Sequence, residues 1–453
     1  MADTTFSETP KSTPGVDQRE PWQINPKFNL KTVVLISFGF FASSAVWSVY
    51  DVQMPVTYGY LIPGQYFLIG FLVAMNSIAG FFIQPYTGNL SDRTRSRFGR
   101  RMPFIIFGIL FSVLLIVILP FTFGSLATII PVVIIFVIVM AVWRAPVVGL
   151  MPDFVKPEDR SKGNAIVNIL GGIGTAVVSL VGGMLIKINL FWGFLFVGVC
   201  MLASLAIVFF GVKEPDTRKW NFDEVATKKK EQGIIPKLRE MAHEEEKSPI
   251  WMVVAIFFWF MTYYAFTDLF SLYATDPSIL NMSRGTAQEL FFLVSVSFII
   301  FALPASILSK KITRKKTIVI GLLISIVTMF VATFIRSRSD TWLLFVVLIT
   351  FGMGWAFINV NSIAMMWDMA RTPKQIGTYT GIYYFGSFLA AILGPMTVGY
   401  VMQYITGLIY LFPVGGCFMV IALLVMLKVK RGEPELSAEE LEAKRKAIQG
   451  SSD

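Results

Sequence analysis

The chain has 453 residues, of which 55% are hydrophobic and only 15% are charged, and its mean hydropathy is +0.65. This composition is too apolar for a soluble enzyme, and the apolar residues are spread too evenly for a soluble protein with one membrane anchor. The net charge of +10 could suit nucleic acid, but the basic residues gather in alternate short loops between apolar runs. That placement excludes a nucleic-acid-binding role.

Twelve apolar segments, each long enough to cross a hydrocarbon core of roughly 30 Å, follow one another along the chain. Only helices and closed barrels satisfy their backbone groups in lipid, and these runs do not alternate as barrel strands do. The sequence therefore predicts an all-α membrane protein. The segments are expected at 31–56, 64–88, 102–121, 126–150, 163–187, 189–212, 250–275, 286–309, 317–336, 341–366, 375–403 and 407–428.

The longest polar gap separates six segments from six. We therefore predict two six-helix bundles joined by a cytoplasmic linker, with a disordered tail that carries four prolines before them and a second tail after them. The predicted boundaries are 1–30 for the first tail, 31–212 and 250–428 for the bundles, 213–249 for the linker, and 429–453 for the second tail.

Lysine and arginine are distributed unequally between the two sides of this arrangement. About 15 fall in the short loops of one side, chiefly in residues 93–101 and 310–316, against about 4 on the other side (Lys187, Arg284, Arg336 and Arg338). Positively charged loops stay in the cytoplasm. We expect both termini to be cytoplasmic and the protein to lie in the plasma membrane, or in the inner membrane if the source is a bacterium.

An internal repeat appears at an offset of about 215 residues. Residues 151–157, Met-Pro-Asp-Phe-Val-Lys-Pro, correspond to residues 366–373, Met-Trp-Asp-Met-Ala-Arg-Thr-Pro, and Gly171 falls on Gly386. The basic loops coincide as well. Two pseudo-symmetric bundles that face each other across a central cavity are expected, as in many carriers.

The strongest motif is the loop from Gly88 to Arg101, Gly-Asn-Leu-Ser-Asp-Arg-Thr-Arg-Ser-Arg-Phe-Gly-Arg-Arg. Its aspartate can accept hydrogen bonds from arginine or from a helix N-terminus, and its arginines hold the loop at the membrane face. We interpret this loop as a gate together with two aspartates at repeat-related positions. The predicted gate residues are Asp92, Arg93, Arg97, Arg100, Arg101, Asp153 and Asp368.

This loop resembles the signature of the major facilitator superfamily, and residues 91–105 look specifically like its sucrose and glycoside carriers, the glycoside-pentoside-hexuronide proton symporter group. The segment Trp143-Arg144-Ala145-Pro146, the run 150–153 and the run 160–165 are similar to the end of their fourth helix and the start of their fifth. The resemblance implies sugar uptake driven by the proton gradient and associates Arg144 with sugar binding. Plant members have an aspartate about three turns earlier, where this chain has Val133.

A guanidinium in the membrane needs a cavity or a partner, and its fork of donors suits vicinal hydroxyls. The repeat offset relates Arg144 to Asn359, so both halves would present polar groups at one depth. The alternatives are a structural ion pair of Arg144 with Asp153 and a side chain that extends to the inner membrane surface. The other predicted sugar-binding residues are polar or aromatic side chains within the apolar segments: Asn361, Trp47, Tyr50, Asn76, Gln84, Asn164, Asn168, Tyr263 and Tyr383.

Two acidic residues, Asp51 and Asp268, are expected near the outer edge of the hydrocarbon core and differ by 217 positions. A carboxylate in a partly dry cavity can take up a proton from outside, which a symporter requires. We predict proton coupling there. The alternative is that both residues face outside water at helix ends.

Motifs for ATP hydrolysis, nucleophilic catalysis, dinucleotides and metals are absent from the sequence, and Cys200 and Cys417 lie in apolar runs as expected core residues. We predict a monomeric transporter, not an enzyme, with no cofactor besides the proton gradient. It would import a sucrose-like or maltose-like disaccharide or an oligosaccharide by alternating access. An efflux or metabolite carrier of the same fold, and a sugar sensor that does not transport, are the alternatives.

Overall fold

The computed structural model describes residues 21–24, 27–156, 159–218, 234–243, 246–370 and 375–432. Twelve helices in these ranges are long and apolar enough to span a membrane. They are α2 (Leu30–Leu61), α3 (Tyr66–Asp92), α4 (Met102–Ile118), α5 (Leu126–Phe154), α6 with α7 (Arg160–Val177 and Gly183–Ile188), α8 (Leu190–Gly211), α10 (Ser248–Thr275), α11 (Arg284–Ile312), α12 (Arg314–Val331), α13 (Thr341–Asp368), α14 (Ile376–Val401) and α15 (Leu411–Leu427).

The predicted fold class is confirmed, and the spans agree with the expected segments to within a few residues. Two short helices lie in regions predicted as a tail and a linker: α1 (Pro21–Ile24) and α9 (Ile234–His243). Most of the predicted first tail, most of the linker and the residues after 432 lie outside the described residues. Cys200 is half-buried and Cys417 is exposed, so the expectation that both are core residues was wrong, because Cys417 lies on an outer helix face.

The two halves repeat one packing scheme. In the first half α2 packs on α6 and α8, α3 on α5, and α4 on α5 and α8. In the second half the corresponding helices do the same: α10 packs on α14 and α15, α11 on α13, and α12 on α13 and α15. All five pairings recur, which is the architecture that the weak sequence repeat predicted.

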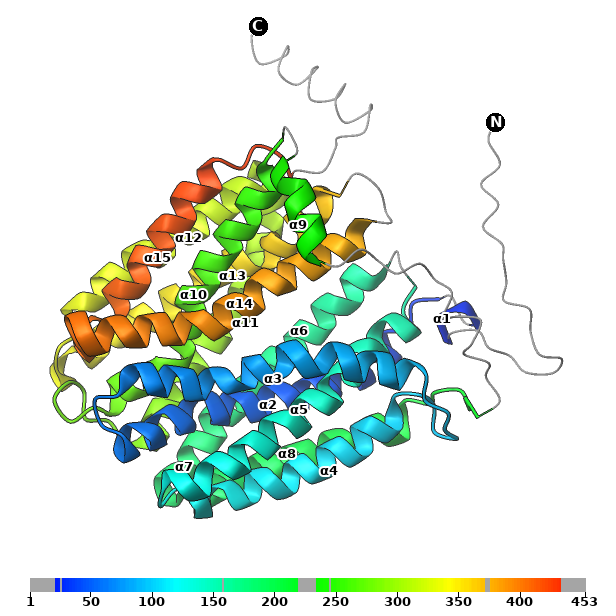
Figure 1. Ribbon diagram of the computed structural model, residues 1–453, viewed down its shortest axis with the longest axis horizontal. Coiled ribbons are helices and arrows are strands. Elements are labelled where there is room, and N and C mark those ends of the chain that lie inside the picture. The colour runs from blue at the N-terminus through cyan, green and yellow to red at the C-terminus, as the bar shows by residue number, and fades with distance from the viewer. Residues whose placement is uncertain are drawn as a thin grey trace, which may run out of the picture.

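The two bundles contact each other chiefly where α2 packs on α10, α3 on α14, and the continuous span of α6 and α7 on α11. We call the end of the molecule that carries loops 93–101 and 310–316 the basic end and the opposite one the far end. Figure 1 shows α3 and α14 converging toward the far end and diverging toward the basic end, where α1 and α9 lie.

Backbones touch across the bundles near the far end, where two seams of glycine allow close approach. In one seam a Cβ on Gly285 of α11 would lie 2.5 Å from the carbonyl oxygen of Gly183. In the other, a Cβ on Gly70 of α3 would lie 2.3 Å from the carbonyl oxygen of Pro395 in α14. A π-helical turn lies beside each seam, at Val178–Gly182 and Met402–Thr406.

Candidate functional site

Three charged side chains from three helices meet between the bundles. Asp51 of α2 lies within electrostatic range of Arg144 of α5, and Asp268 of α10 lies within range of Asp51. Asn76 of α3 adds a hydrogen bond to Asp51, with its Nδ2 3.4 Å from Oδ1. We call Asp51, Asn76, Arg144 and Asp268 the central cluster; it draws on both bundles.

The two carboxylates lie well inside their helices. Helix α2 continues ten residues beyond Asp51, and α10 continues seven beyond Asp268. By helical rise these lengths are about 15 Å and 10 Å. The alternative that both residues face outside water at helix ends was therefore wrong, because both helices extend past the apolar runs through residues such as Tyr58 and Thr275 that are buried in the protein. The position of the two residues near the outer edge of the hydrocarbon core stays a prediction.

Trp143, which precedes Arg144 in the chain, determines which way the Arg144 side chain points. Trp143 is fully buried, and its Cβ lies 2.3 Å from where a Cβ on Gly108 of α4 would stand. The indole Nε1 also donates to the Ser112 hydroxyl at 3.0 Å. Successive residues of a helix point about 100° apart. Anchoring Trp143 on α4 therefore turns Arg144 away from α4 and toward the second bundle.

Hydroxyl groups of the second bundle face Arg144. Tyr264 of α10 and Tyr384 of α14 both lie within its electrostatic range, and Tyr264 forms a hydrogen bond with Ser387. Arg144 is half-buried and Tyr384 is half exposed. The alternative of an ion pair with Asp153 does not hold, because Asp153 pairs with Arg100 and Arg101. Arg144 instead faces the space where the two bundles meet.

Aromatic rings pack beside the cluster in each bundle. In the first, Trp47 makes an edge contact with Tyr50, which stacks on Phe136 of α5 at 5.6 Å between ring centroids. The Trp47 Nε1 and Tyr50 hydroxyl are buried without a hydrogen-bond partner in the described part of the chain. In the second, Tyr263 stacks on Trp355 at 3.9 Å. The sequence analysis missed Trp355 as a site residue because its spacing also fits core packing.

Other predicted binding residues form bonds within their own neighbourhoods. Tyr383 shares a hydrogen bond of 3.0 Å with Ser362 of α13. Asn168 donates to the carbonyl oxygen of Asn164 within α6, and Asn361 donates to that of Phe357 within α13. Gln84 lies half-buried against Gly80 on α3, and Asn359 is also half-buried.

Asn359 and Arg144 stand at equivalent places in two helices that the repeat relates to each other. Each stands eighteen residues after the start of its helix, counted from Leu126 in α5 and from Thr341 in α13. A contact between these two side chains is not among those that the structure shows for the described residues, so a sugar-binding role of Asn359 stays a prediction.

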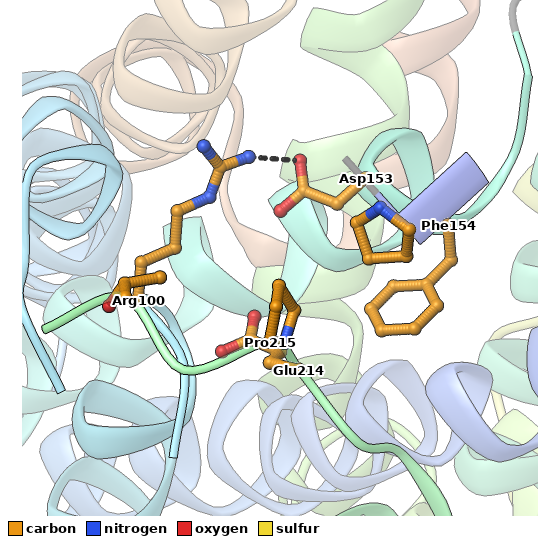
Figure 2. Close-up of a pocket in the computed structure, with 7 residues that line it drawn as sticks. Arg100, Asp153, Phe154, Glu214 and Pro215 are labelled. Atoms are coloured by element: carbon orange, nitrogen blue, oxygen red, sulfur yellow. Dashed lines mark ion pairs between the residues drawn. The ribbon is translucent and has the colours of Figure 1, made fainter. Parts of the chain in front are cut away.

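Most of the predicted gate residues of the first bundle form an ion network at the basic end. Arg101 donates from Nε and Nη2 to the two oxygens of Asp153, at 2.5 Å and 3.1 Å, and its Nη2 lies 2.8 Å from Asp92. Arg100 pairs with the same carboxylate of Asp153 at 2.8 Å (Figure 2). The guanidinium of Arg101 also donates to Ser91. The network links the ends of α3 and α5 to the start of α4.

The second bundle repeats this pairing. Arg314, at the start of α12, forms an ion pair with Asp368, at the end of α13. By the repeat offset these residues correspond to Arg100 and Asp153. Of the other predicted gate residues, Arg93 is exposed and Arg97 lies over the ring of Phe98 at 4.5 Å.

The sequence analysis missed a polar network between the bundles. Gln53 of α2 donates to Gln288 of α11 at 3.2 Å, and Gln288 donates to the Ser48 hydroxyl at the same distance. Nearer the far end, Lys187 pairs with Glu289 at 2.5 Å. Uncharged glutamines inside apolar runs give no distinct signal in one sequence, so this network could be found only from the packing.

The described residues contain no group of three or more metal-ligating side chains.

A twelve-helix fold in two pseudo-symmetric bundles, with a charged cluster where the bundles meet and a seam at one end, is that of a membrane transporter. The sequence model of the Major Facilitator Superfamily matches residues 36–278 and 276–450. The chain therefore belongs to the major facilitator superfamily.

Solved structures agree with this assignment at the level of the fold. The nucleoside transporter NupG is 14% identical with a TM-score of 0.65, and the match covers 89% of this chain and 99% of that one. A bacterial homologue of the human lysosomal transporter Spinster, in an inward-facing and occupied conformation, is 15% identical with a TM-score of 0.64 and coverages of 90% and 97%. No curated protein shows a significant match.

Proposed function

We propose that this transporter imports a sugar or glycoside, of disaccharide size or somewhat larger, by alternating access coupled to proton symport. The observation that carries the proposal is the meeting of Asp51, Arg144 and Asp268 between the bundles. In this proposal the protein acts as a monomer in the plasma membrane, and its basic end faces the cytoplasm.

The donors and acceptors at the cluster suit a polyhydroxylated solute. The guanidinium of Arg144 can donate two parallel hydrogen bonds to neighbouring hydroxyls. Asn76 and the Tyr264 and Tyr384 hydroxyls lie around it. Buried polar atoms are nearly always hydrogen-bonded, and sugar hydroxyls would supply partners for the Trp47 Nε1 and the Tyr50 hydroxyl.

The charges of the cluster favour symport of a cation. Two carboxylates and one guanidinium leave one negative charge unbalanced, and an unbalanced charge away from water is costly. A neutral sugar cannot balance it, whereas one proton on a carboxylate can. Loading of a proton would therefore accompany loading of sugar.

The packing supports an inward-facing state. The glycine seams join the bundles near the far end, while the helices diverge toward the basic end (Figure 1). Positively charged loops favour the cytoplasm. The central cluster would thus communicate with the cytoplasm in this conformation and release its cargo there.

Purified protein in proteoliposomes tests the proposal. We expect radiolabelled sucrose or maltose to accumulate when the outside is acidic, and a proton-conducting ionophore to abolish the accumulation. Nucleosides belong in the same panel, because a nucleoside transporter shares the fold. Accumulation of nucleosides without sugars would overturn the substrate class. Sugar binding without accumulation would indicate a sensor, and sugar movement only outward along the applied gradient would indicate efflux.

A further inference from the structure

The segment after α8, residues 212–217, lies on the loop of residues 93–101, which we call the Arg-rich loop. Thr217 is almost fully buried there and makes hydrogen bonds to the loop through its backbone N–H and its hydroxyl. Its backbone N–H donates to the Ser96 carbonyl oxygen at 3.0 Å, its hydroxyl accepts from the Ser96 N–H at 3.0 Å, and the same hydroxyl donates to the Thr94 carbonyl oxygen at 2.9 Å. The chain leaving the first bundle is thereby fixed to the loop between α3 and α4.

Glu214 makes the second attachment. Its Oε2 accepts the backbone N–H groups of Arg101 and Met102, at 3.0 Å and 3.1 Å, where α4 begins. A carboxylate is favoured at such a position by the unpaired donors and the dipole of the helix. The loop makes room with Gly99, whose φ is +95° and whose Cβ, if present, would lie 2.1 Å from Oε2. Only glycine readily adopts this positive φ and also leaves room for the Glu214 carboxylate.

The surroundings of Glu214 carry both signs of charge. Arg100 and Arg101 come from the start of α4 and Asp153 from the end of α5, while Asp92 of α3 reaches the group through Arg101. Pro21 of α1 and Phe154 line the same small pocket (Figure 2). On the segment itself Asp216 pairs with Arg218. Part of Glu214 stays exposed, but burial of its carboxyl raises the pKa of Glu214 from 4.5 to about 7. The N–H groups of Arg101 and Met102 and the Arg101 guanidinium favour the ionised form, but burial, with a smaller contribution from Asp153, outweighs them.

In the second bundle the described residues make a corresponding attachment through backbone carbonyl groups. Lys315, which the repeat relates to Arg101, donates from Nζ to the carbonyl oxygens of Leu427 and Val429, at 3.2 Å and 2.5 Å. Val429 stands at the repeat position of Glu214 and is fully buried. A backbone carbonyl does not titrate, so the acceptors of these two hydrogen bonds differ in kind from the Glu214 carboxyl of the first bundle.

We propose that residues 212–217 form a proton-linked clamp on the Arg-rich loop, which tightens as the solution at the basic end becomes acidic. The docked clamp binds a proton at Glu214 between pH 4.5 and about 7, where a released clamp would be ionised in water. Docking is therefore favoured below pH 7 and weakens as the pH rises through 7. Between pH 8 and pH 6 the docking equilibrium should rise about tenfold.

The clamp gives the transporter a regulator that lies outside the central cluster. Docking holds the Arg-rich loop on its own bundle, and the basic ends must rearrange before the bundles can close there. If the basic end is cytoplasmic, as in the proposed function, imported protons tighten the clamp and slow the return of the empty carrier. The clamp itself does not depend on that function.

Hydrogen–deuterium exchange of the detergent-purified protein tests the clamp directly. The reporters are the amides of Ser96, Arg101, Met102 and Thr217, which the clamp protects. After correction for intrinsic exchange, we expect their protection to rise about tenfold from pH 8 to pH 6. In Glu214→Gln, which resembles the protonated acid, protection should be constant over this range. In the control Asp216→Asn, two residues along the exposed chain, the pH dependence should persist.

Two results would overturn the clamp: equal protection at pH 6 and pH 8 in the unaltered protein, or the same pH response in Glu214→Gln. If Glu214→Gln does not fold, Glu214→Asp serves instead. Its carboxylate is too short to reach the N-terminus of α4, so protection of the reporter amides from exchange should fall at every pH. Exchange reports on docking whether or not a substrate is known.

A proteoliposome assay with varied internal pH separately tests the regulation of transport. Acidic interiors should slow uptake by the unaltered protein but not by Glu214→Gln.

Discussion

Gly183 and Gly285 lie back to back across the two bundles, so close that a Cβ on Gly183 would stand 2.8 Å from the carbonyl oxygen of Gly285. The second seam has the same composition, since the repeat relates Gly285 to Gly70 and Gly183 to Gly399. A Cβ on Gly399 would lie 2.3 Å from the Tyr66 carbonyl oxygen. Both seams bring backbone to backbone, so any larger side chain there must force the bundles apart.

We expect Gly285→Trp to open the far end. An indole cannot fit between α7 and α11, and the two bundles are separate bodies that can rotate. The readout is labelling of Gln53→Cys, which lies behind the seam and is fully buried, by a membrane-impermeant maleimide after Cys200 and Cys417 have been replaced by serine. The labelling rate should rise at least about tenfold, since a population shift of about 1.4 kcal/mol suffices for that factor.

Gly124→Trp is the matched control. Gly124 lies in the turn before α5 at the same end of the molecule, and a Cβ there meets nothing within 4 Å. Its labelling rate should equal that of Gln53→Cys alone. A Gly285→Trp protein that folds and still protects position 53 would show that the seam is not what closes the far end.

The substitution Arg144→Lys tests the proposed role of Arg144 in sugar binding. The charge opposite Asp51 is kept, but one ammonium cannot make two parallel hydrogen bonds. Because a hydrogen bond to a charged group is worth about 1.5–3 kcal/mol, sugar uptake should fall about tenfold or more while expression stays normal. Uptake into proteoliposomes measures this, with Arg336→Lys at the exposed far end as control. Unchanged uptake would remove Arg144 from the binding site.

Replacing Asp268 by asparagine should separate binding from coupling. Asp268 is buried and accepts a hydrogen bond from Thr267 at 3.2 Å, and an amide keeps this acceptor but cannot take up a proton. We expect Asp268→Asn to lose accumulation driven by a pH gradient while it still exchanges internal for external sugar. Asp276→Asn, at the exposed end of the same helix, should keep both activities. Retained accumulation in Asp268→Asn would exclude this carboxylate as the coupling group.

Apolar periodicity and the repeat were sufficient to predict the architecture. Length and hydropathy placed each span to within a few residues. The offset of about 215 related the two basic loops to each other and Asp153 to Asp368, and in the structure Arg100 pairs with Asp153 and Arg314 with Asp368. Ionisable residues in apolar runs stand out because lipid penalises them. For that reason Asp51, Arg144 and Asp268 could be chosen before the structure brought them together.

Uncharged residues within the helices and charged residues outside them could not be assigned to contacts from the sequence pattern alone. Gln53 and Gln288 cost little in an apolar run, so their bond across the bundles depends on packing that one sequence does not reveal. Glu214 sits among charges typical of any loop, and its docking at Arg101 requires the approach of segments 113 residues apart. In the sequence the spacing of Thr286 and Glu289 favours a helix-capping pair, but in the structure Ser283 caps α11 and Glu289 pairs with Lys187.

The ion network at the basic end predicts unequal stability effects in the two halves. Asp153→Asn leaves Arg101, whose side chain is 8% exposed, and Arg100 without their shared anion, and breaking a buried pair in this way costs about 3–5 kcal/mol. Asp368→Asn removes a pair whose side chains are 21% and 26% exposed, and because water screens such a pair the cost should be about 1 kcal/mol or less. Thermal unfolding in one detergent, followed by intrinsic fluorescence, should therefore show a clearly larger fall in midpoint for Asp153→Asn. Equal falls would mean that the Arg101 network is no more stabilising than its counterpart, and that water reaches both ion pairs alike.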